Sequence, residues 1–536
     1  MVEQVKLYPY EQDMLASLNT AGYASLADVF EQSCREHADR TAYVCMGQDI
    51  SFADIDRMSA AFAVYLRGEG GMSPGDRIAI QLPNIGQYPV VAWGALRAGL
   101  VIVNTNPMYT AREMAHQFND SGASALVVMA ELLPRVEPVL ANTGIQQVIA
   151  TSVFDLLEAQ PLPETGLSRI TSLPEILAAA GGMHIPPVAI TMNDVALLQY
   201  TGGTTGPAKG AVLTHGNIFA SARQTADIVE IDPDNPDIVL APMPLYHIYG
   251  FTVNVVSTFC SGGQSVLIPD PRDTDSMVGL MKKYPFTAMA GINTLFASLL
   301  QHPQFDEIDF SHVKGIVAGG AALVEDIAVE WERRTGSQIY EGYGLSETTA
   351  VLTGNSPGSR QLGTVGRPMA YQQVKIVDRQ GRTLGNNQEG EVLVRGPQVM
   401  HGYWNRPEAT AEAMDDDGWF RTGDIALMQD DGFVKICDRL KDMILVSGFN
   451  VYPNEIESVV SAHPDVIECA AIGVPDEKSG EAVKLYVNAR PGLDAEQLQA
   501  FCREQLTAYK VPRFIEFRAE LPKSNVGKIL RRELRA

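Results

Sequence analysis

The chain has 536 residues, more than one hydrophobic core usually supports, so we expect at least two domains. Hydrophobic residues make up 46% and charged residues 20% of the chain, which is typical of ordinary globular proteins. The formal net charge of −23 argues against general nucleic-acid binding, and it requires any polyanion site to be locally basic.

The cysteine spacing and the terminal sequences indicate in which cellular compartment the protein resides. The six cysteines are scattered without a CxxC pair, so we expect reduced and mostly buried thiols. The opening MVEQVKLYPYEQDML has early acidic residues and no apolar stretch that would indicate a secretory signal. No window of 18 uninterrupted apolar residues predicts a membrane span, and the final RRELRA is unlike a peroxisomal SKL address. These features predict a cytoplasmic protein.

The first 130 residues alternate between helical and strand-like patterns. The order is helix 52–70, strand 76–82, helix 89–99, strand 100–107, helix 110–122 and strand 125–130. Such alternation indicates βαβ units on a mostly parallel sheet. It returns over residues 286–300 and 313–336, so we predict an α/β fold with two βαβ-type sheets in one large domain.

The predicted secondary structure changes after about Gly363, from alternating helices and strands to short strands. Short strands with glycine turns at 371–385, 390–400 and 432–440 predict a small β-barrel or roll. From Arg439 a compact α+β pattern follows, so we place an N-terminal domain at 1–438 and a small C-terminal domain at 439–536. Residues 154–187, with five prolines, are predicted to form a surface connection.

A glycine-rich loop, YTGGTTGPAKG, runs from Tyr200 to Gly210 between two strand-like segments. A Walker A loop requires lysine directly after the last glycine and then a helix, whereas here Lys209 precedes Gly210 and a strand follows. The glycine N–H groups still form a concavity suited to an anion. The loop also offers three hydroxyl donors: Thr201, Thr204 and Thr205. For the loop alone, a flexible surface hairpin is the alternative interpretation.

Four further motifs follow this loop in order: PMPLYHIYG at 242–250, YEGYGLSETT at 340–349, the segment 418–457, and LPKSNVGKILRREL at 521–534. Together they resemble the adenylate-forming superfamily of acyl-CoA synthetases, adenylation domains and luciferases. The resemblance covers nearly the whole chain. The segments LQYTGGTTG, KYPFTA and LVSGFNVYPNEIE are most similar to bacterial long-chain fatty-acid–CoA ligases.

The resemblance implies a ligase reaction in two halves. A medium- or long-chain fatty-acid carboxylate attacks the α-phosphate of ATP, which gives acyl-AMP and pyrophosphate, and the thiol of CoA then displaces AMP. ATP and Mg²⁺ are the implied cofactors, with CoA as co-substrate. The protein has to orient anions that repel one another and to stabilise the charge that develops on phosphorus.

The resemblance assigns the glycine-rich loop to the phosphates of ATP, with Lys209 as the counter-charge. The loop residues assigned to ATP are Thr201, Gly202, Gly203, Thr204, Thr205, Gly206 and Lys209. Glu347, with Thr204, is the implied Mg²⁺ ligand, because Mg²⁺ prefers few carboxylates together with phosphate oxygens and water. An ordinary exposed glutamate at a helix start is the alternative for Glu347.

The nucleoside is expected to contact residues from three motifs. Tyr343 would lie against adenine, where an aromatic face supplies apolar contact, with Gly344 beside it. Thr348 would donate to a phosphate. Asp424 is similar to the family's ribose-binding carboxylate, and Arg439 would contact ribose or phosphate. A tyrosine of the core is the alternative for Tyr343.

Small residues and one histidine complete the first half-site. Gly319, Gly320 and Ala321 would wall the nucleotide, because small residues let the backbone approach closely. His247 matches the position near the acyl carboxylate and the α-phosphate. A histidine beside apolar residues is otherwise more often structural.

Lys528, in NVGKILRR, is expected to bind both the fatty-acid carboxylate and the α-phosphate, because a cation between two anions lowers their mutual repulsion. The alternative is a solvated basic tail with Arg531, Arg532 and Arg535.

The resemblance also implies that the C-terminal domain is mobile and rotates about a hinge at Lys441. Rotation would withdraw Lys528 and bring another segment to CoA. The residues implied for CoA are Ser447, Gly448 and Phe449.

The sequence leaves several points open. Tunnel depth, and therefore acyl chain length, is a three-dimensional property that composition does not report. Residues 154–187 are less basic and less amphipathic than expected for a membrane-docking relative, so peripheral contact with the inner face of the membrane stays open, as does a homodimer. The alternatives to a fatty-acid–CoA ligase are adenylation of another carboxylic acid, delivery to an acyl-carrier protein, a luciferase-like oxidase and a non-catalytic nucleotide-binding protein.

Overall fold

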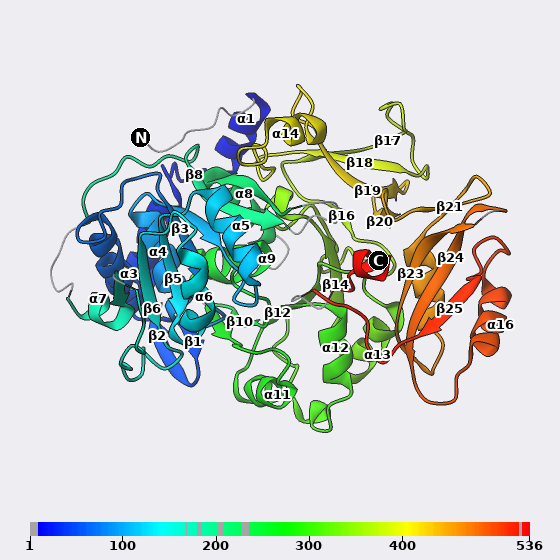
Figure 1. The fold of residues 1–536 in the computed structure, drawn as a ribbon, viewed down its shortest axis with the longest axis horizontal. Coiled ribbons are helices and arrows are strands. Elements are labelled where there is room, and N and C mark those ends of the chain that lie inside the picture. Colours follow the sequence, from blue (N-terminus) through cyan, green and yellow to red (C-terminus); the bar gives the residue numbers. More distant parts are fainter. Residues whose placement is uncertain are drawn as a thin grey trace.

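The computed structural model of the chain describes residues 9–167, 169–179, 185–201, 207–226, 235–476, 478–524 and 528–535. Two large sheets with their helices make up the part drawn from blue to green in Figure 1. The yellow, orange and red elements form two smaller sheets. The arrangement confirms the α/β fold class predicted from the sequence.

The seven-stranded sheet has the strand order β7-β6-β5-β3-β4-β8-β9. Its strands are β3 (Arg77–Gln81), β4 (Val101–Asn104), β5 (Ala125–Met129), β6 (Gln147–Thr151), β7 (Ile170–Ser172), β8 (Val195–Thr201) and β9 (Lys209–Thr214). All pairings are parallel except β8 with β9. The helices α4 (Gln87–Arg97), α5 (Ala111–Ser121) and α6 (Leu133–Leu140) connect its parallel strands, as the alternating pattern predicts.

Local sequence signals explain where these helices begin and end. Thr110 and Glu113 form a capping box at the start of α5, and Gly122 ends the helix with a φ of 64°. All residues of α4 are buried, in a hydrophobic cluster that contains Ile78 of the seven-stranded sheet and Leu267 of the nine-stranded sheet. The continuous apolar run of α4 therefore reflects burial on every side.

The nine-stranded sheet has the order β16-β15-β14-β13-β12-β10-β11-β1-β2. Its strands are β1 (Thr41–Cys45), β2 (Gln48–Ser51), β10 (Ile238–Ala241), β11 (Gln264–Leu267), β12 (Ala288–Gly291), β13 (Gly315–Ala318), β14 (Ile339–Tyr343), β15 (Thr353–Gly354) and β16 (Arg367–Pro368). The strands from β1 through β14 pair in parallel, and antiparallel strands close both edges. This is the second predicted sheet.

Further helices belong to this part of the chain: α1 (Pro9–Leu18), α2 (Leu26–Glu36), α3 (Phe52–Arg67), α7 (Leu173–Ala179), α8 (His215–Ala226), α9 (Ile248–Gly250), α10 (Thr258–Cys260), α11 (Thr274–Lys283), α12 (Asn293–Leu300), α13 (Glu325–Thr335) and α14 (Pro407–Ala413). A π-helix, η2, spans Phe251–Ser257. The proline-rich stretch 154–187 is more than a connection, because it contributes β7 to the sheet edge and α7 beside it.

The predicted small β-barrel is wrong in one respect, because the sheet is open. Strands β17 (Gln373–Val377), β18 (Gly390–Arg395), β19 (Phe420–Met428) and β20 (Val434–Arg439) form an antiparallel sheet in chain order. Closure would pair β17 with β20, and within residues 373–439, all of which are described, these two strands do not pair. The outer edge of β20 is already occupied, since Val434 exchanges backbone hydrogen bonds with Val365 and Gly366.

The C-terminal sheet contains β21 (Ile444–Val446), β22 (Phe449–Val451), β23 (Val466–Asp476), β24 (Gly480–Ala489) and β25 (Phe514–Phe517). Helices α15 (Pro453–Ser461), α16 (Ala495–Gln505) and α17 (Arg531–Leu534) complete it. It has its own hydrophobic cluster, which includes Ile444, Ile456 and Leu485. Figure 1 shows β21, β23, β24, β25 and α16, in orange and red, at one end of the molecule.

All six cysteines are free thiols, and Cys34, Cys45, Cys469 and Cys502 are buried. In the part of the chain that the structure describes, no helix combines the length and the apolar character needed to cross a membrane.

Candidate active site

The glycine-rich loop connects β8 to β9, so the predicted strand–loop–strand arrangement is confirmed. Thr201 and Lys209 are paired residues at the mouth of this hairpin. The residues between them that would contact phosphate, Gly202, Gly203, Thr204, Thr205 and Gly206, lie outside the described residues, and their role stays a prediction. The Lys209 ammonium lies 4.8 Å from the centre of the Tyr403 ring, a cation–π distance.

Tyr403 links the hairpin to the predicted metal ligand. The segment 401–404 pairs with β9, since the Trp404 N–H donates to the Gly210 carbonyl at 2.8 Å and Tyr403 bridges Ala211. The Tyr403 hydroxyl then donates to Oε1 of Glu347 at 2.9 Å. One aromatic residue therefore contacts both Lys209 and Glu347. Tyr403 was not predicted from the sequence, although its Gly-Tyr-Trp cluster, in a segment without clear periodicity, was the available signal.

Glu347 fits a magnesium ligand by its chemistry. It lies on the short 3₁₀ turn η4 (Ser346–Thr348), where burial raises the pKa of its carboxyl and the Tyr403 hydrogen bond partly opposes that rise. The side chain nevertheless retains some exposure to solvent. A carboxylate that is desolvated yet accessible gains most from a nearby cation, and Mg²⁺ accepts one carboxylate with phosphate oxygens. The partner predicted with it, Thr204, lies outside the described residues.

Thr348 lies inside this turn, and its predicted contact with a phosphate stays a prediction. It is buried, and its hydroxyl accepts from the Leu345 N–H at 2.9 Å and donates to the Leu345 carbonyl at 3.2 Å. It therefore shapes the turn that presents Glu347. The turn is strained, because Thr349 and Ala350 have φ values of 49° and 87°.

Gly344 allows this turn to fold back on itself. A Cβ at Gly344 would lie 1.7 Å from the carbonyl oxygen of Ala350, which no side chain tolerates without backbone movement. Glycine is therefore required at position 344 by the fold of the turn, independently of the predicted role in nucleotide binding.

Tyr343, Asp424 and Arg439 come together from two sheets. The Tyr343 hydroxyl, at the end of β14, donates to Oδ2 of Asp424 at 2.5 Å. Nε of Arg439 lies 3.4 Å from Oδ1 of the same carboxylate, and the two residues are cross-strand partners in β19 and β20. Burial and the Asp424 charge raise the pKa of Tyr343 well above its ordinary value. Asp424 therefore contacts both Tyr343 and Arg439, and its role in binding ribose stays a prediction.

The small residues predicted to wall the nucleotide follow β13, the parallel neighbour of β14. A Cβ at Gly319 would lie 3.2 Å from the ring of Tyr249. Gly320 is exposed with a φ of 81°, and Ala321 is half-buried. These residues and Tyr343 therefore lie at the carboxyl ends of adjacent parallel strands, where open α/β sheets bind their ligands.

His247 and Lys528 lie within electrostatic range of each other. Burial, followed by the charge of Lys528, lowers the pKa of His247 to about 4, so its ring is neutral near pH 7. His247 Nδ1 accepts from the Tyr249 N–H at 3.3 Å, which leaves the proton of the neutral ring on Nε2. Although Lys528 is exposed, the protein atoms around it and then Arg439 lower its pKa to about 8, against the opposing charge of Asp424.

The residues predicted for CoA form a tight turn. Ser447 and Gly448 join β21 to β22 with φ values of 51° and 85°, the signs required by a type I′ hairpin. Phe449 is 56% exposed and stacks on Tyr509 at 4.8 Å, within the C-terminal sheet. Lys441, the predicted hinge, lies between β20 and β21 and is exposed.

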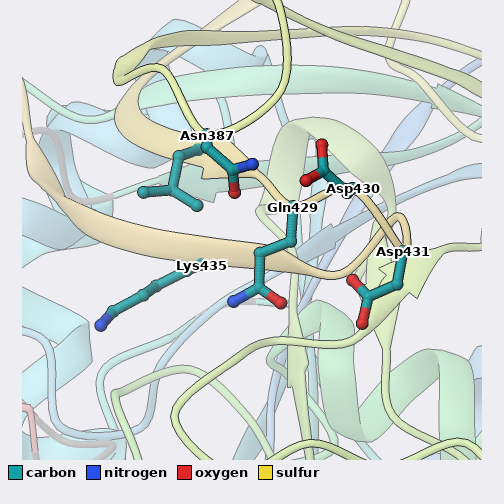
Figure 2. A pocket seen from close by; sticks show the side chains of 6 residues that line it. Asn387, Gln429, Asp430, Asp431 and Lys435 are labelled. Carbon is teal, nitrogen blue, oxygen red and sulfur yellow. The ribbon is translucent and has the colours of Figure 1, made fainter.

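A separate hollow of about 500 Å³ lies beside the turn between β19 and β20. Its lining consists of Asn387, Leu427, Gln429, Asp430, Asp431 and Lys435. Figure 2 shows Asp430 and Asp431 on the turn itself, with Lys435 on the far side of Gln429. No residue predicted for the active site lines it.

Comparisons with known proteins agree on one family. A family model described as AMP-binding enzyme matches residues 30–404, and one described as AMP-binding enzyme C-terminal domain matches residues 455–528. The chain is 45% identical to a long-chain-fatty-acid–CoA ligase of Escherichia coli O157:H7 over 551 aligned positions, which cover 100% of this chain and 98% of that relative.

Two solved structures share the fold. The anthranilate CoA ligase AuaEII in complex with anthranoyl-AMP gives a TM-score of 0.87 at 25% identity, over 96% of this chain and 97% of that one. ATP-bound MatB from Rhodopseudomonas palustris gives a TM-score of 0.86 at 29% identity, over 95% of this chain and 98% of that one.

Proposed function

Because the chain belongs to the AMP-binding enzyme family, we propose that it is an AMP-forming fatty-acid–CoA ligase. It activates a fatty acid with ATP to acyl-AMP and pyrophosphate, and then transfers the acyl group to CoA with release of AMP. The observation that carries this function is the meeting of Lys528 with His247, Asp424 and Arg439. These residues come from three distant parts of the chain, and the proposed reaction needs all of them near one nucleotide.

The first half-reaction brings two anions into contact. Lys528, as an ammonium, would bind the fatty-acid carboxylate and the α-phosphate together and reduce their repulsion. His247, neutral with its proton on Nε2, would donate a hydrogen bond to an oxygen of the same groups. Lys209 would offset negative charge on the departing pyrophosphate, and its ring partner Tyr403 restricts where that ammonium lies.

Nucleotide position follows from the second cluster. Asp424, held by Tyr343 and Arg439, would accept from the ribose hydroxyls, and Tyr343 would lie along adenine. Glu347, held by Tyr403, would bind Mg²⁺, which neutralises phosphate charge when bound. These residues orient the α-phosphate toward the carboxylate, which is the larger part of catalysis for phosphoryl and acyl-phosphate chemistry.

The proposal includes two moving parts, residues 1–438 and 439–536, with Lys441 as the hinge. Lys528 lies within electrostatic range of Arg439 and Asp424, which supports the proposal that this arrangement serves the first half-reaction. Although Lys441 is exposed, the protein atoms around it and then the charge of Arg439 lower its pKa. Rotation about Lys441 would withdraw Lys528 and present the turn of Ser447, Gly448 and Phe449 to CoA.

Acyl chain length is the finer part of the proposal, and we favour a medium- or long-chain fatty acid. The high identity to a long-chain-fatty-acid–CoA ligase supports it. The test is AMP and thioester formation with CoA across saturated acids from acetate to palmitate. A maximum at eight carbons or more is expected. Activity confined to shorter acids, or transfer to a carrier protein instead of CoA, would overturn this part.

Membrane contact and a homodimer stay predictions. Flotation with anionic vesicles tests the first, and light scattering of the purified chain tests the second.

A further inference from the structure

A cluster of charged side chains surrounds Arg531 at the start of α17, three residues after Lys528. Arg531 binds the Glu457 carboxylate of α15 in a bidentate contact: Nε donates to Oε1 at 3.0 Å, and one Nη atom donates to Oε2 at 2.7 Å. The same Nη atom donates to Oδ1 of Asn454 at 2.6 Å. The other Nη lies 3.4 Å from Asp438 and 3.4 Å from Asp442. The segment that carries Lys528 is thereby attached to α15.

Asp438 is the exceptional member, because it belongs to β20, ahead of Lys441, whereas Arg531 and its other partners, Asp442, Asn454 and Glu457, follow Lys441. Its side chain is fully buried. Oδ2 accepts from the Asn454 N–H at 2.7 Å, and Oδ1 accepts from its neighbour Arg439 at 2.7 Å. The Tyr452 side chain at the N-cap of α15 makes no capping hydrogen bond. Asp438 therefore supplies, from outside the helix, the acceptor that its first turn needs.

The burial of this carboxylate makes its partners necessary. Desolvation raises the pKa of Asp438 to about 6, while Arg531 and the N–H groups of Asn454 and Arg439 oppose the rise. A buried charge that lost Arg531 and the helix N-terminus together would be left largely uncompensated. The contact is therefore favourable only in the orientation in which α15 and α17 both reach β20.

We propose that Asp438 is a positioning residue, which holds α15 and Arg531 against β20 and so keeps Lys528 beside His247 and Asp424 for acyl-AMP formation. This inference rests on the proposed function, since it assumes two half-reactions and a hinge at Lys441. A large rotation about Lys441 moves Asn454 and Arg531 away from Asp438, because Asp438 precedes the hinge, whereas Asp442 and Glu457, the other carboxylates that face Arg531, follow it. Both orientations are visited in each turnover, so neither can be strongly preferred, and loss of one contact shifts the balance measurably.

The test is Asp438→Asn, with the two half-reactions measured separately in the full-length enzyme. Acyl-AMP formation is followed as carboxylate-dependent ATP–pyrophosphate exchange, and the second half as thioester formation from supplied acyl-AMP and CoA. Asparagine keeps an acceptor for the Asn454 N–H but removes the charge that faces Arg531, which remains paired with Glu457. We expect exchange to fall about fivefold or more, and the second half to stay within about twofold of wild type.

The matched control is Glu455→Gln. Glu455 lies in the first turn of the same helix and pairs with Lys510 at 2.6 Å, and both residues follow Lys441. Both half-reactions should be unchanged in this variant. Equal loss of both halves in Asp438→Asn, or no loss in either, would overturn the positioning role.

Circular dichroism establishes whether Asp438→Asn folds. If it does not, Arg531→Lys replaces it, since lysine cannot bind Glu457 bidentately and reach Asp438 at the same time. The same separation of half-reactions is then expected, and equal loss of both halves would again overturn the inference. Absence of exchange in the wild-type enzyme would instead contradict the proposed function itself.

Discussion

Removal of the Tyr403 hydroxyl tests how the site holds its metal ligand. In Tyr403→Phe, Glu347 loses the hydrogen bond at 2.9 Å, while the ring can remain 4.8 Å from the Lys209 ammonium. A hydrogen bond to a charged group contributes about 1.5–3 kcal/mol. Because Glu347 retains some solvent exposure, we take the lower part of that range, about 1.5–2 kcal/mol. This corresponds to a fall of about ten- to thirtyfold in kcat/KM for acyl-AMP formation.

The assay is carboxylate-dependent ATP–pyrophosphate exchange over a range of Mg²⁺ concentrations. The lost hydrogen bond also lets the pKa of Glu347 rise further, so more Mg²⁺ should be needed for half-maximal exchange. Tyr65→Phe is the matched control, because the Tyr65 hydroxyl donates to Thr171 at 3.0 Å, away from the site. Exchange in Tyr403→Phe within about twofold of wild type at low Mg²⁺ would refute the linkage between Tyr403 and Glu347.

Three further predictions concern pH and packing. The kcat/KM for acyl-AMP formation should decline as pH rises through about 8, because the lowered pKa of Lys528 leaves a neutral amine there, and a decline that persisted in Lys528→Arg would contradict this assignment. Burial lowers the pKa of His215 to about 3 from an ordinary 6.5, so the unfolded chain takes up the proton first. The free energy of unfolding should therefore fall from about pH 6.5 toward about pH 3, by about 1.4 kcal/mol per unit for this group, and in urea titrations the difference in unfolding free energy between wild type and His215→Gln should change with pH across that window. Gly344→Ala should lower Tm and weaken ATP binding, since its Cβ would lie 1.7 Å from the Ala350 oxygen, and an unchanged Tm would show that the turn can relax.

Local patterns were sufficient for most elements of the large sheets. The helix of residues 111–121 has a capping box at its start and a glycine directly after its end, both readable from the sequence. Strand β5 is a continuous apolar run. The strand–loop–strand arrangement around Lys209 could also be predicted, because short apolar segments lie directly before and after the glycine-rich loop. These signals depend on neighbours along the chain, which the sequence displays directly.

Closure of the small sheet could not be predicted in the same way. Whether β20 pairs with β17 depends on which backbone reaches its free edge, and residues 365–366 occupy that edge from the end of the nine-stranded sheet. No short-range pattern reports such competition between edges. The strands themselves were predicted, and only their long-range pairing was wrong.

The candidate site shows the same division. Motif resemblance predicted Tyr343, Asp424, Arg439 and Lys528 as site residues, and the structure brings them close together. Tyr403 was missed, because its importance comes from contacts with residues 56 and 194 positions away, which only the folded chain creates.

The role of Lys528 is tested most directly by Lys528→Ala, with the two half-reactions measured apart. We predict that carboxylate-dependent exchange is abolished, while thioester formation from supplied acyl-AMP and CoA stays close to the wild-type rate. Retained exchange, or equal loss of both reactions, would contradict the assignment of this ammonium to the first half-reaction alone.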